Sequence, residues 1–117
     1  MDPLVEEATR KAAVAWVSGQ PVWCLWHGGA LYVVHGPGEQ PAPVLSTVDS
    51  QVEVTVRGDH GGSIVTWPAD VERVAPGTPG WAEVVPLLAA RRLNGPADPD
   101  HWAATCTVSR LTPRTAG

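Results

Sequence analysis

Short runs of β-branched and aromatic residues, separated by turns rich in glycine and proline, constrain the fold of this chain most. Residues 13–17, 22–27 and 30–35 form the first three runs, and Gly28-Gly29 separates the second from the third. A glycine pair between two such runs is typical of a tight β-hairpin, because both turn positions favour a positive φ. This part of the chain therefore predicts three consecutive antiparallel strands.

Two further runs predict a second, longer hairpin. Valines alternate with polar residues over 52–57, as in a strand with one buried face and one solvent-exposed face. A glycine-rich tip over 57–63 joins this run to a long strand over 64–74. Pro68 lies inside the long strand and has no N–H donor, so an edge strand or a bulge is expected there.

Helical patterns lie near both ends of the chain. Asp2 and Pro3 are a typical helix start, and basic residues end that segment at Lys11. The second pattern, over 79–92, has apolar residues at the spacing of one helix face. A last short strand is predicted over 106–111.

Together these elements predict a mainly β protein, a small six-stranded antiparallel barrel with an N-terminal helix and a C-terminal helix. Residues 36–48 are expected to form a loop, residues 101–104 a turn, and residues 112–117 a frayed tail. The chain has 117 residues and no linker-like segment, so a single domain over 1–117 is expected.

Charge and hydrophobicity exclude several classes of protein. The formal net charge is −4, which argues against binding to nucleic acid. No apolar run approaches the roughly 18 residues of a membrane span, and the acidic N-terminal segment lacks the order of a signal peptide. We therefore expect a cytoplasmic protein that binds neither nucleic acid nor membrane, with Cys24 and Cys106 as free thiols.

Three short motifs stand in a recurring order: Pro21–Trp26 (PVWCLW), Gly28-Gly29 and Leu31–Val33 (LYV). In this order they resemble the flavin-binding split-barrel family, which includes pyridoxamine-phosphate oxidase-like proteins and deazaflavin-dependent reductases. The resemblance covers roughly residues 1–95. It implies a split barrel, a homodimer with the cofactor site between two subunits, and flavin mononucleotide (FMN) or a deazaflavin as cofactor.

The chain departs from that family where the cofactor phosphate would bind. Cofactor-binding members carry Ser or Thr with Arg or Lys after the LYV-type strand. Residues 35–41 of this chain contain no lysine or arginine and include one carboxylate, Glu39. Because charge-assisted donors hold a phosphate, we expect FMN to bind less tightly than in typical members.

Seven residues form the candidate cofactor-binding site, and each type also has a structural interpretation. A tryptophan ring can stack on a planar ligand, or pack in the core or a dimer interface. An arginine can contact a ligand anion or be a solvated strand charge, and a glycine-rich loop can cradle a phosphate or form a turn. The candidates are Trp23, Trp26, His35, Gly36, Gly38, Arg57 and Trp67.

Cysteines and histidines are also the residue types that commonly bind zinc. Cys24 and His27 are three positions apart, and on one strand such residues point to opposite faces. A metal site is therefore not predicted, and no pattern assigns a catalytic residue.

Two functions are compatible with the sequence. The first is a flavin- or deazaflavin-dependent oxidoreductase. The second is a module of the same fold that binds another small planar or anionic ligand, or that serves in dimeric interactions. The missing phosphate-binding cation favours the second. Six tryptophans are a large aromatic area for one small core, which adds a physical reason to expect a homodimer.

Overall fold

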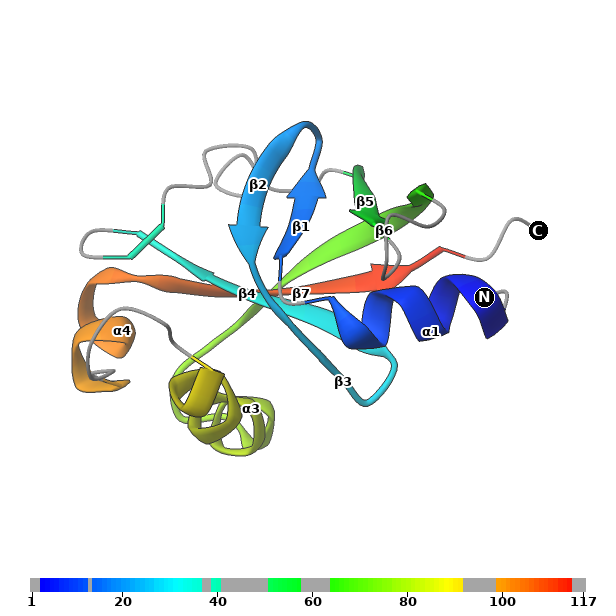
Figure 1. The fold of residues 1–117 in the computed structure, drawn as a ribbon. Helices are drawn as coiled ribbons and strands as arrows, with labels where there is room; N and C mark the ends of the chain where they lie inside the picture. The colour runs from blue at the N-terminus through cyan, green and yellow to red at the C-terminus, as the bar shows by residue number, and fades with distance from the viewer. Residues whose placement is uncertain are drawn as a thin grey trace.

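The computed structural model describes residues 3–12, 14–36, 39–40, 51–57, 64–91 and 99–114. Seven strands and three helices lie in this part of the chain (Figure 1). In chain order they are α1 (Pro3–Lys11), β1 (Val14–Val17), β2 (Gln20–Trp23), β3 (Leu25–His27), β4 (Ala30–His35), β5 (Gln51–Arg57), β6 (Ile64–Val74), α3 (Pro79–Arg91), α4 (Pro99–Thr105) and β7 (Thr107–Pro113).

All seven strands pair antiparallel in one sheet, in the order β2-β1-β5-β6-β7-β4-β3. The two edge strands, β2 and β3, are consecutive in the chain and are separated by Cys24 alone. One continuous segment therefore reaches both edges of the sheet and nearly closes it into a barrel. The predicted hairpin at Gly28-Gly29 is confirmed: His27 pairs with Ala30, and both glycines have positive φ.

The strand count differs from the predicted six because the segment 22–27 is two strands and not one. A straight strand could not pair with both β1 and β4, since these lie near opposite ends of the sheet order. The chain therefore breaks its pairing at Cys24.

Two local predictions also need correction: the turn expected at 101–104 is part of the helix α4, and β7 extends to Pro113 instead of ending at residue 111.

Pro68 lies in an interior strand, so the prediction of an edge strand was wrong. β6 pairs with β5 on one side and with β7 on the other. The Arg114 N–H donates to the Pro68 carbonyl over 2.9 Å, one position beyond the last β6–β7 pair, Ala69 with Pro113. Pro68 thus faces the end of β7, where its missing N–H removes only the last hydrogen bond of the ladder.

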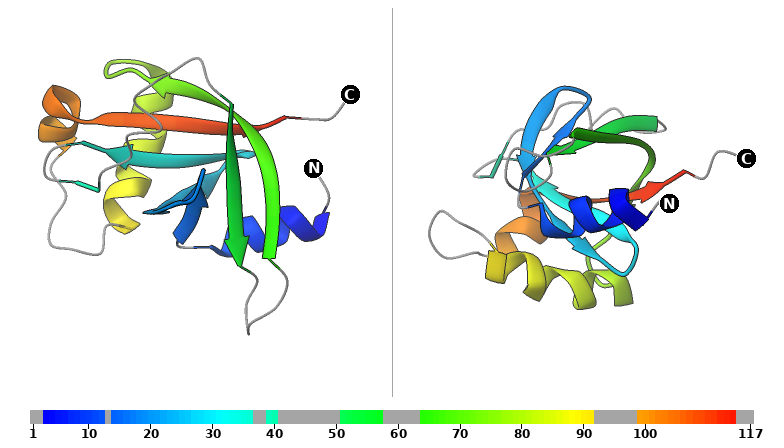
Figure 2. Two further views of the ribbon diagram at one scale, coloured as in Figure 1. Left: turned by 90° about the horizontal axis from the view of Figure 1, so that it is seen from above. Right: turned by 45° about the vertical axis from the view of Figure 1, so that its right-hand side comes forward.

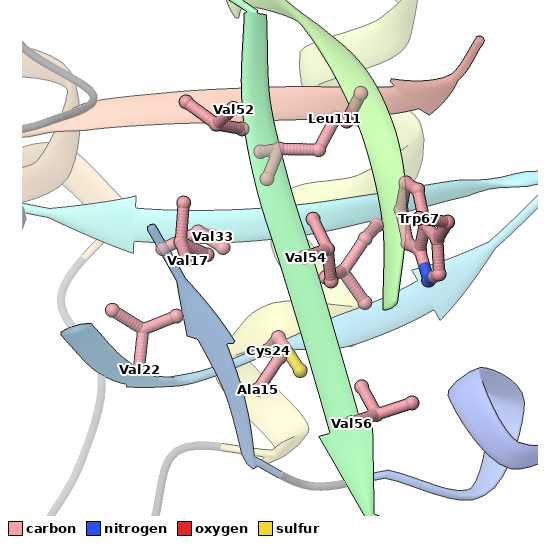
Figure 3. Close-up of a cluster of buried hydrophobic side chains, with 12 residues drawn as sticks. Ala15, Val17, Val22, Cys24, Val33, Val52, Val54, Val56, Trp67 and Leu111 are labelled. Atoms are coloured by element: carbon pink, nitrogen blue, oxygen red, sulfur yellow. The ribbon is translucent and has the colours of Figure 1, made fainter. Parts of the chain in front are cut away.

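Two hydrophobic clusters stabilise the fold, one inside the barrel and one outside it. The interior cluster gathers side chains from six of the strands, including Val17, Val33, Val54 and Trp67 (Figure 3). The outer cluster lies where α3 and α4 pack on the sheet, and it includes the residues Val84, Val85 and Leu88 of the predicted face of α3.

Helix α1 packs against the interior cluster through Val5 and Ala8, and Ala12, the residue after the helix, packs there too. Figure 2 (left) shows this helix beside the lower ends of β5 and β6, whereas α4 lies at the other end of the molecule beside the start of β7. None of the described helices is both long and apolar enough to cross a bilayer.

Candidate functional site

The interior face of the sheet becomes polar at the end opposite α1, where β4 and β6 finish and β7 starts. Ser109 of β7 lies directly opposite Arg73 of β6 and Val33 of β4. Directly paired residues share one face of a sheet, and Val33 belongs to the interior cluster. His35 follows Val33 by two positions and so lies on the same face. Three polar side chains, His35, Arg73 and Ser109, therefore lie on the interior-facing side at this end.

His35 and Ser109 form a buried hydrogen-bonded pair. The distance from His35 Nε2 to Ser109 Oγ is 2.9 Å, and the two residues are 3% and 1% exposed. Burial lowers the pKa of His35 below its ordinary value of 6.5, so the ring is neutral at pH 7. When Nε2 carries the proton it donates to Ser109, and the serine hydroxyl hydrogen is then free for an anionic ligand.

The cation nearest to this pair in the sheet is Arg73, which lies opposite Ser109 on the neighbouring strand β6. Most other described cations have a partner: Arg57 lies over the Trp16 ring at 5.1 Å, and Arg91 Nη1 donates to the Cys24 carbonyl at 3.4 Å. By contrast, Arg73 is exposed, and no residue in the described ranges forms a hydrogen bond or ion pair with its guanidinium. A ligand anion would therefore not have to displace a described partner.

The Gln40 side chain fills the gap where the barrel is split. The Trp23 N–H donates to Gln40 Oε1 over 2.7 Å, and Gln40 Nε2 donates to the Trp23 and Val34 carbonyls over 2.9 and 3.0 Å. The amide thus makes the bonds that a strand residue would make between β2 and β4. Gly36 N–H also donates to the Gln40 carbonyl over 3.2 Å, which fixes the turn after β4 beside His35.

Gln40→Glu is expected to destabilise the protein by about 2–3 kcal/mol, because the carboxylate cannot donate to either carbonyl. Urea denaturation measures this loss. Gln51→Glu is the matched control, since Gln51 is exposed at the start of β5, and it should cost less than about 0.5 kcal/mol. Equal losses in the two variants would show that the Gln40 amide does not support the split.

The seven sequence candidates fall into three places. Trp67 is buried in the interior cluster, where its Nε1–H donates to Thr9 Oγ1 over 3.1 Å and its ring meets Trp26 edge-on at 6.2 Å. Arg57 stacks on Trp16 on the outer surface of the barrel. Trp23 and Gly36 bond to Gln40, and His35, next to Gly36 in the chain, bonds to Ser109. Gly38 lies outside the described residues.

Sequence reasoning missed two members of this site, Ser109 and Gln40. Ser109 meets His35 across 74 positions of the chain, through the pairing of β4 with β7. The Gln40 side chain donates to the backbone carbonyls of Trp23 and Val34, and no local sequence pattern predicts that these two carbonyls lie close together. No signal in the sequence alone pointed to either residue.

The titration of His35 predicts a pH-dependent stability. Its pKa is lower in the folded protein than in the unfolded chain, so the unfolded chain binds the proton more tightly. The stabilisation that comes from keeping His35 neutral is complete above about pH 6.5, the pKa in the unfolded chain. It is lost as the pH falls through the pKa of His35 in the folded protein. We expect the Tm to decrease from pH 7.5 to pH 5, and to decrease less in His35→Gln. His101→Gln is the control, and a profile of His35→Gln identical to the wild type would contradict this assignment.

Cys24 and Cys106 are thiols that form no disulfide with each other, as predicted, and both are buried. Burial raises the pKa of the Cys24 thiol to about 12, so its reactive thiolate is scarce at neutral pH. Across the described ranges, no group of three or more His, Cys, Asp or Glu side chains could hold a metal ion.

Comparison with solved structures finds a similar fold in HutZ, the heme storage protein from Vibrio cholerae. The TM-score is 0.68 at 16% sequence identity, and the match covers 98% of this chain and 91% of HutZ. No family model matches the chain, and no curated protein matches its sequence. The similarity to HutZ and the nearly closed antiparallel sheet together support a split-barrel fold for this chain.

Proposed function

We propose that this chain is a cytoplasmic, split-barrel module that binds a small planar molecule bearing an acidic group. The observation that carries the proposal is the Ser109–His35 pair beside Arg73, at the polar end of an otherwise apolar barrel interior. One cation and one hydroxyl donor suit a single carboxylate or phosphate group. The planar part of the ligand is suggested by the split-barrel fold, which is similar to that of a protein named for heme storage.

A flavin- or deazaflavin-dependent oxidoreductase is the second candidate, and it rests on the resemblance of the sequence to the flavin-binding split-barrel family. Gly36, Glu39 and Gln40, the described residues of the turn after β4, contribute one carboxylate and no cation. Gln40 is already bonded to Trp23 and Val34. Tight FMN binding needs several charge-assisted donors, each contributing roughly 1.5–3 kcal/mol. One exposed arginine falls short of that requirement, so the binding module is the better supported of the two.

Titration with FMN and with riboflavin, which lacks the phosphate, tests the proposal. A single arginine contact of about 1.4 kcal/mol predicts that FMN binds about tenfold more tightly than riboflavin, with Kd values in the micromolar range or weaker. Arg73→Gln should remove that difference. Arg10→Gln, the same charge change on the exposed surface of α1, should preserve it.

The remaining outcomes separate the two candidates. A submicromolar Kd for FMN would contradict the binding module and favour the flavin enzyme, because it would reveal further phosphate donors. Equal FMN affinities in the wild type and in Arg73→Gln would contradict the placement of the acidic group. Hemin, which is planar and carries two carboxylates, is the parallel probe. Its affinity should also decrease in Arg73→Gln.

A further inference from the structure

His35 lies one hydrogen bond away from the hydroxyl group that would meet the ligand. His35 Nε2 and Ser109 Oγ are 2.9 Å apart, and Ser109 lies directly opposite Arg73 on β6. Because His35 and Ser109 are 3% and 1% exposed, water screens a charge on the imidazole only weakly. An anion held by Ser109 and Arg73 would therefore interact strongly with that charge.

The direction of the His35–Ser109 hydrogen bond depends on the protonation of the imidazole. A neutral ring with its proton on Nδ1 accepts from Ser109, and the serine hydroxyl hydrogen is then not available to a ligand. A neutral ring with its proton on Nε2 donates to Ser109, and so does the protonated ring. Protonation therefore leaves only the direction in which Ser109 can donate to an anion. Imidazolium, hydroxyl and anion then form one chain of charge-assisted hydrogen bonds.

The second proton of His35 would come from water and bind at Nδ1. Within the described ranges, no residue forms a hydrogen bond with Nδ1, so its lone pair can take up this proton when Nε2 already carries one. Burial lowers the pKa of His35, and the ring is neutral at pH 7 while no ligand is bound. An anion beside Ser109 acts in the opposite direction, because a nearby opposite charge favours the charged form of the ring.

The described elements around His35 carry titratable groups of both signs. They are Arg73 of β6, Glu39 in the turn after β4, Cys106 before β7, and Asp100 and His101 of α4. The β7 residues that face His35, Thr107 and Ser109, carry hydroxyls and no charge. Arg73 disfavours the imidazolium through like-charge repulsion. A ligand anion paired with Arg73 would offset this repulsion, so it would favour protonation of His35 by a second route.

We propose that His35 is a proton-dependent second cation of the ligand site, so that binding of an acidic group and uptake of a proton by His35 favour each other. The inference rests on the proposed function, because it needs an anion at Ser109 and Arg73. It adds a preference of that site for acidic pH. The affinity for the anion should rise as the pH falls through the pKa of His35 in the complex, and it should be constant well above that pH.

Fluorescence titration with naphthalenesulfonate tests the coupling. This probe is planar and its sulfonate stays ionised at every pH used, whereas the FMN phosphate itself titrates with a pKa of about 6. The Kd of the wild type should be about tenfold lower at pH 5.5 than at pH 8, a typical size for coupling between two ligands. His35→Gln should show one Kd at both pH values, whereas His101→Gln should retain the tenfold change. Naphthalenesulfonamide, the uncharged control, should bind equally at both pH values.

NMR titration of the His35 ring in the wild-type protein is the second measurement, and it needs no substitution of a buried residue. The pKa of His35 should be higher with the sulfonate bound than without it. An unchanged pKa, or a pH dependence of the Kd that remains in His35→Gln, would overturn the inference.

A third variant separates the inference from the proposed function. If Arg73→Gln weakens binding of the sulfonate but the wild-type Kd is the same at both pH values, the inference fails and the proposed function stands. If the sulfonate does not bind, or binds Arg73→Gln as tightly as the wild type, the proposed function fails and the inference fails with it.

Discussion

Trp102→Ala is expected to lower the free energy of unfolding by about 3–5 kcal/mol, the range typical of a large aromatic side chain removed from a core. Trp102 is fully buried in the outer cluster, and it is the buried residue of α4. Its loss would leave a cavity between α4 and the sheet and would remove the main apolar anchor of that helix. Urea denaturation followed by circular dichroism measures the change.

Trp102→Phe separates packing from hydrogen bonding at this position. The buried indole Nε1–H has no acceptor among the described residues. Phenylalanine removes this donor and keeps most of the aromatic volume, so its cost should be about 1–2 kcal/mol, well below that of alanine. If Trp102→Phe costs as much as Trp102→Ala, the N–H has an essential partner and the packing explanation is wrong.

Gly36→Ala is expected to destabilise the protein by about 2–4 kcal/mol, through both backbone strain and steric conflict. Gly36 has φ 135°, a conformation that essentially only glycine adopts. A Cβ there would lie 3.0 Å from Cys106 Cα and 3.2 Å from the Thr105 carbonyl oxygen. Both are backbone atoms at the junction of α4 and β7, so relief requires β4 to move away from this junction, beside His35 and Ser109.

Gly77→Ala is the matched control for the steric component. Gly77 also has a positive φ, 83°, but an added Cβ would meet no atom within 4 Å. Its cost should be about 1 kcal/mol, which reflects the backbone alone. Gly36→Ala should also perturb the environment of His35 in NMR spectra, whereas Gly77→Ala should not. Equal destabilisation by the two variants would contradict close packing between Gly36 and Cys106.

Features that depend on neighbouring residues were predictable from the sequence. The alternating valines specified β5, and Gly28-Gly29 specified the β3–β4 hairpin, because side-chain period and turn conformation are local properties. The cap of α3 is local as well, because Thr78 Oγ1 accepts from the N–H of Trp81, three residues along the chain, over 3.3 Å. The resemblance to the split-barrel family correctly indicated the antiparallel barrel but not its strand count.

The arrangement of the candidate site was decided by tertiary structure. The sequence suggested His35 and Gly36, but Ser109 and Gln40 act across pairings between distant strands. The break at Cys24 and the interior position of Pro68 have the same origin, because barrel closure determines which strands become neighbours. The alternation of side chains along a strand predicts which face of the sheet each residue lies on. It does not predict which distant strand pairs with that strand. The sequence by itself therefore determined most of the helices and strands, and only the folded sheet decided which polar side chains lie together at the polar end of the barrel.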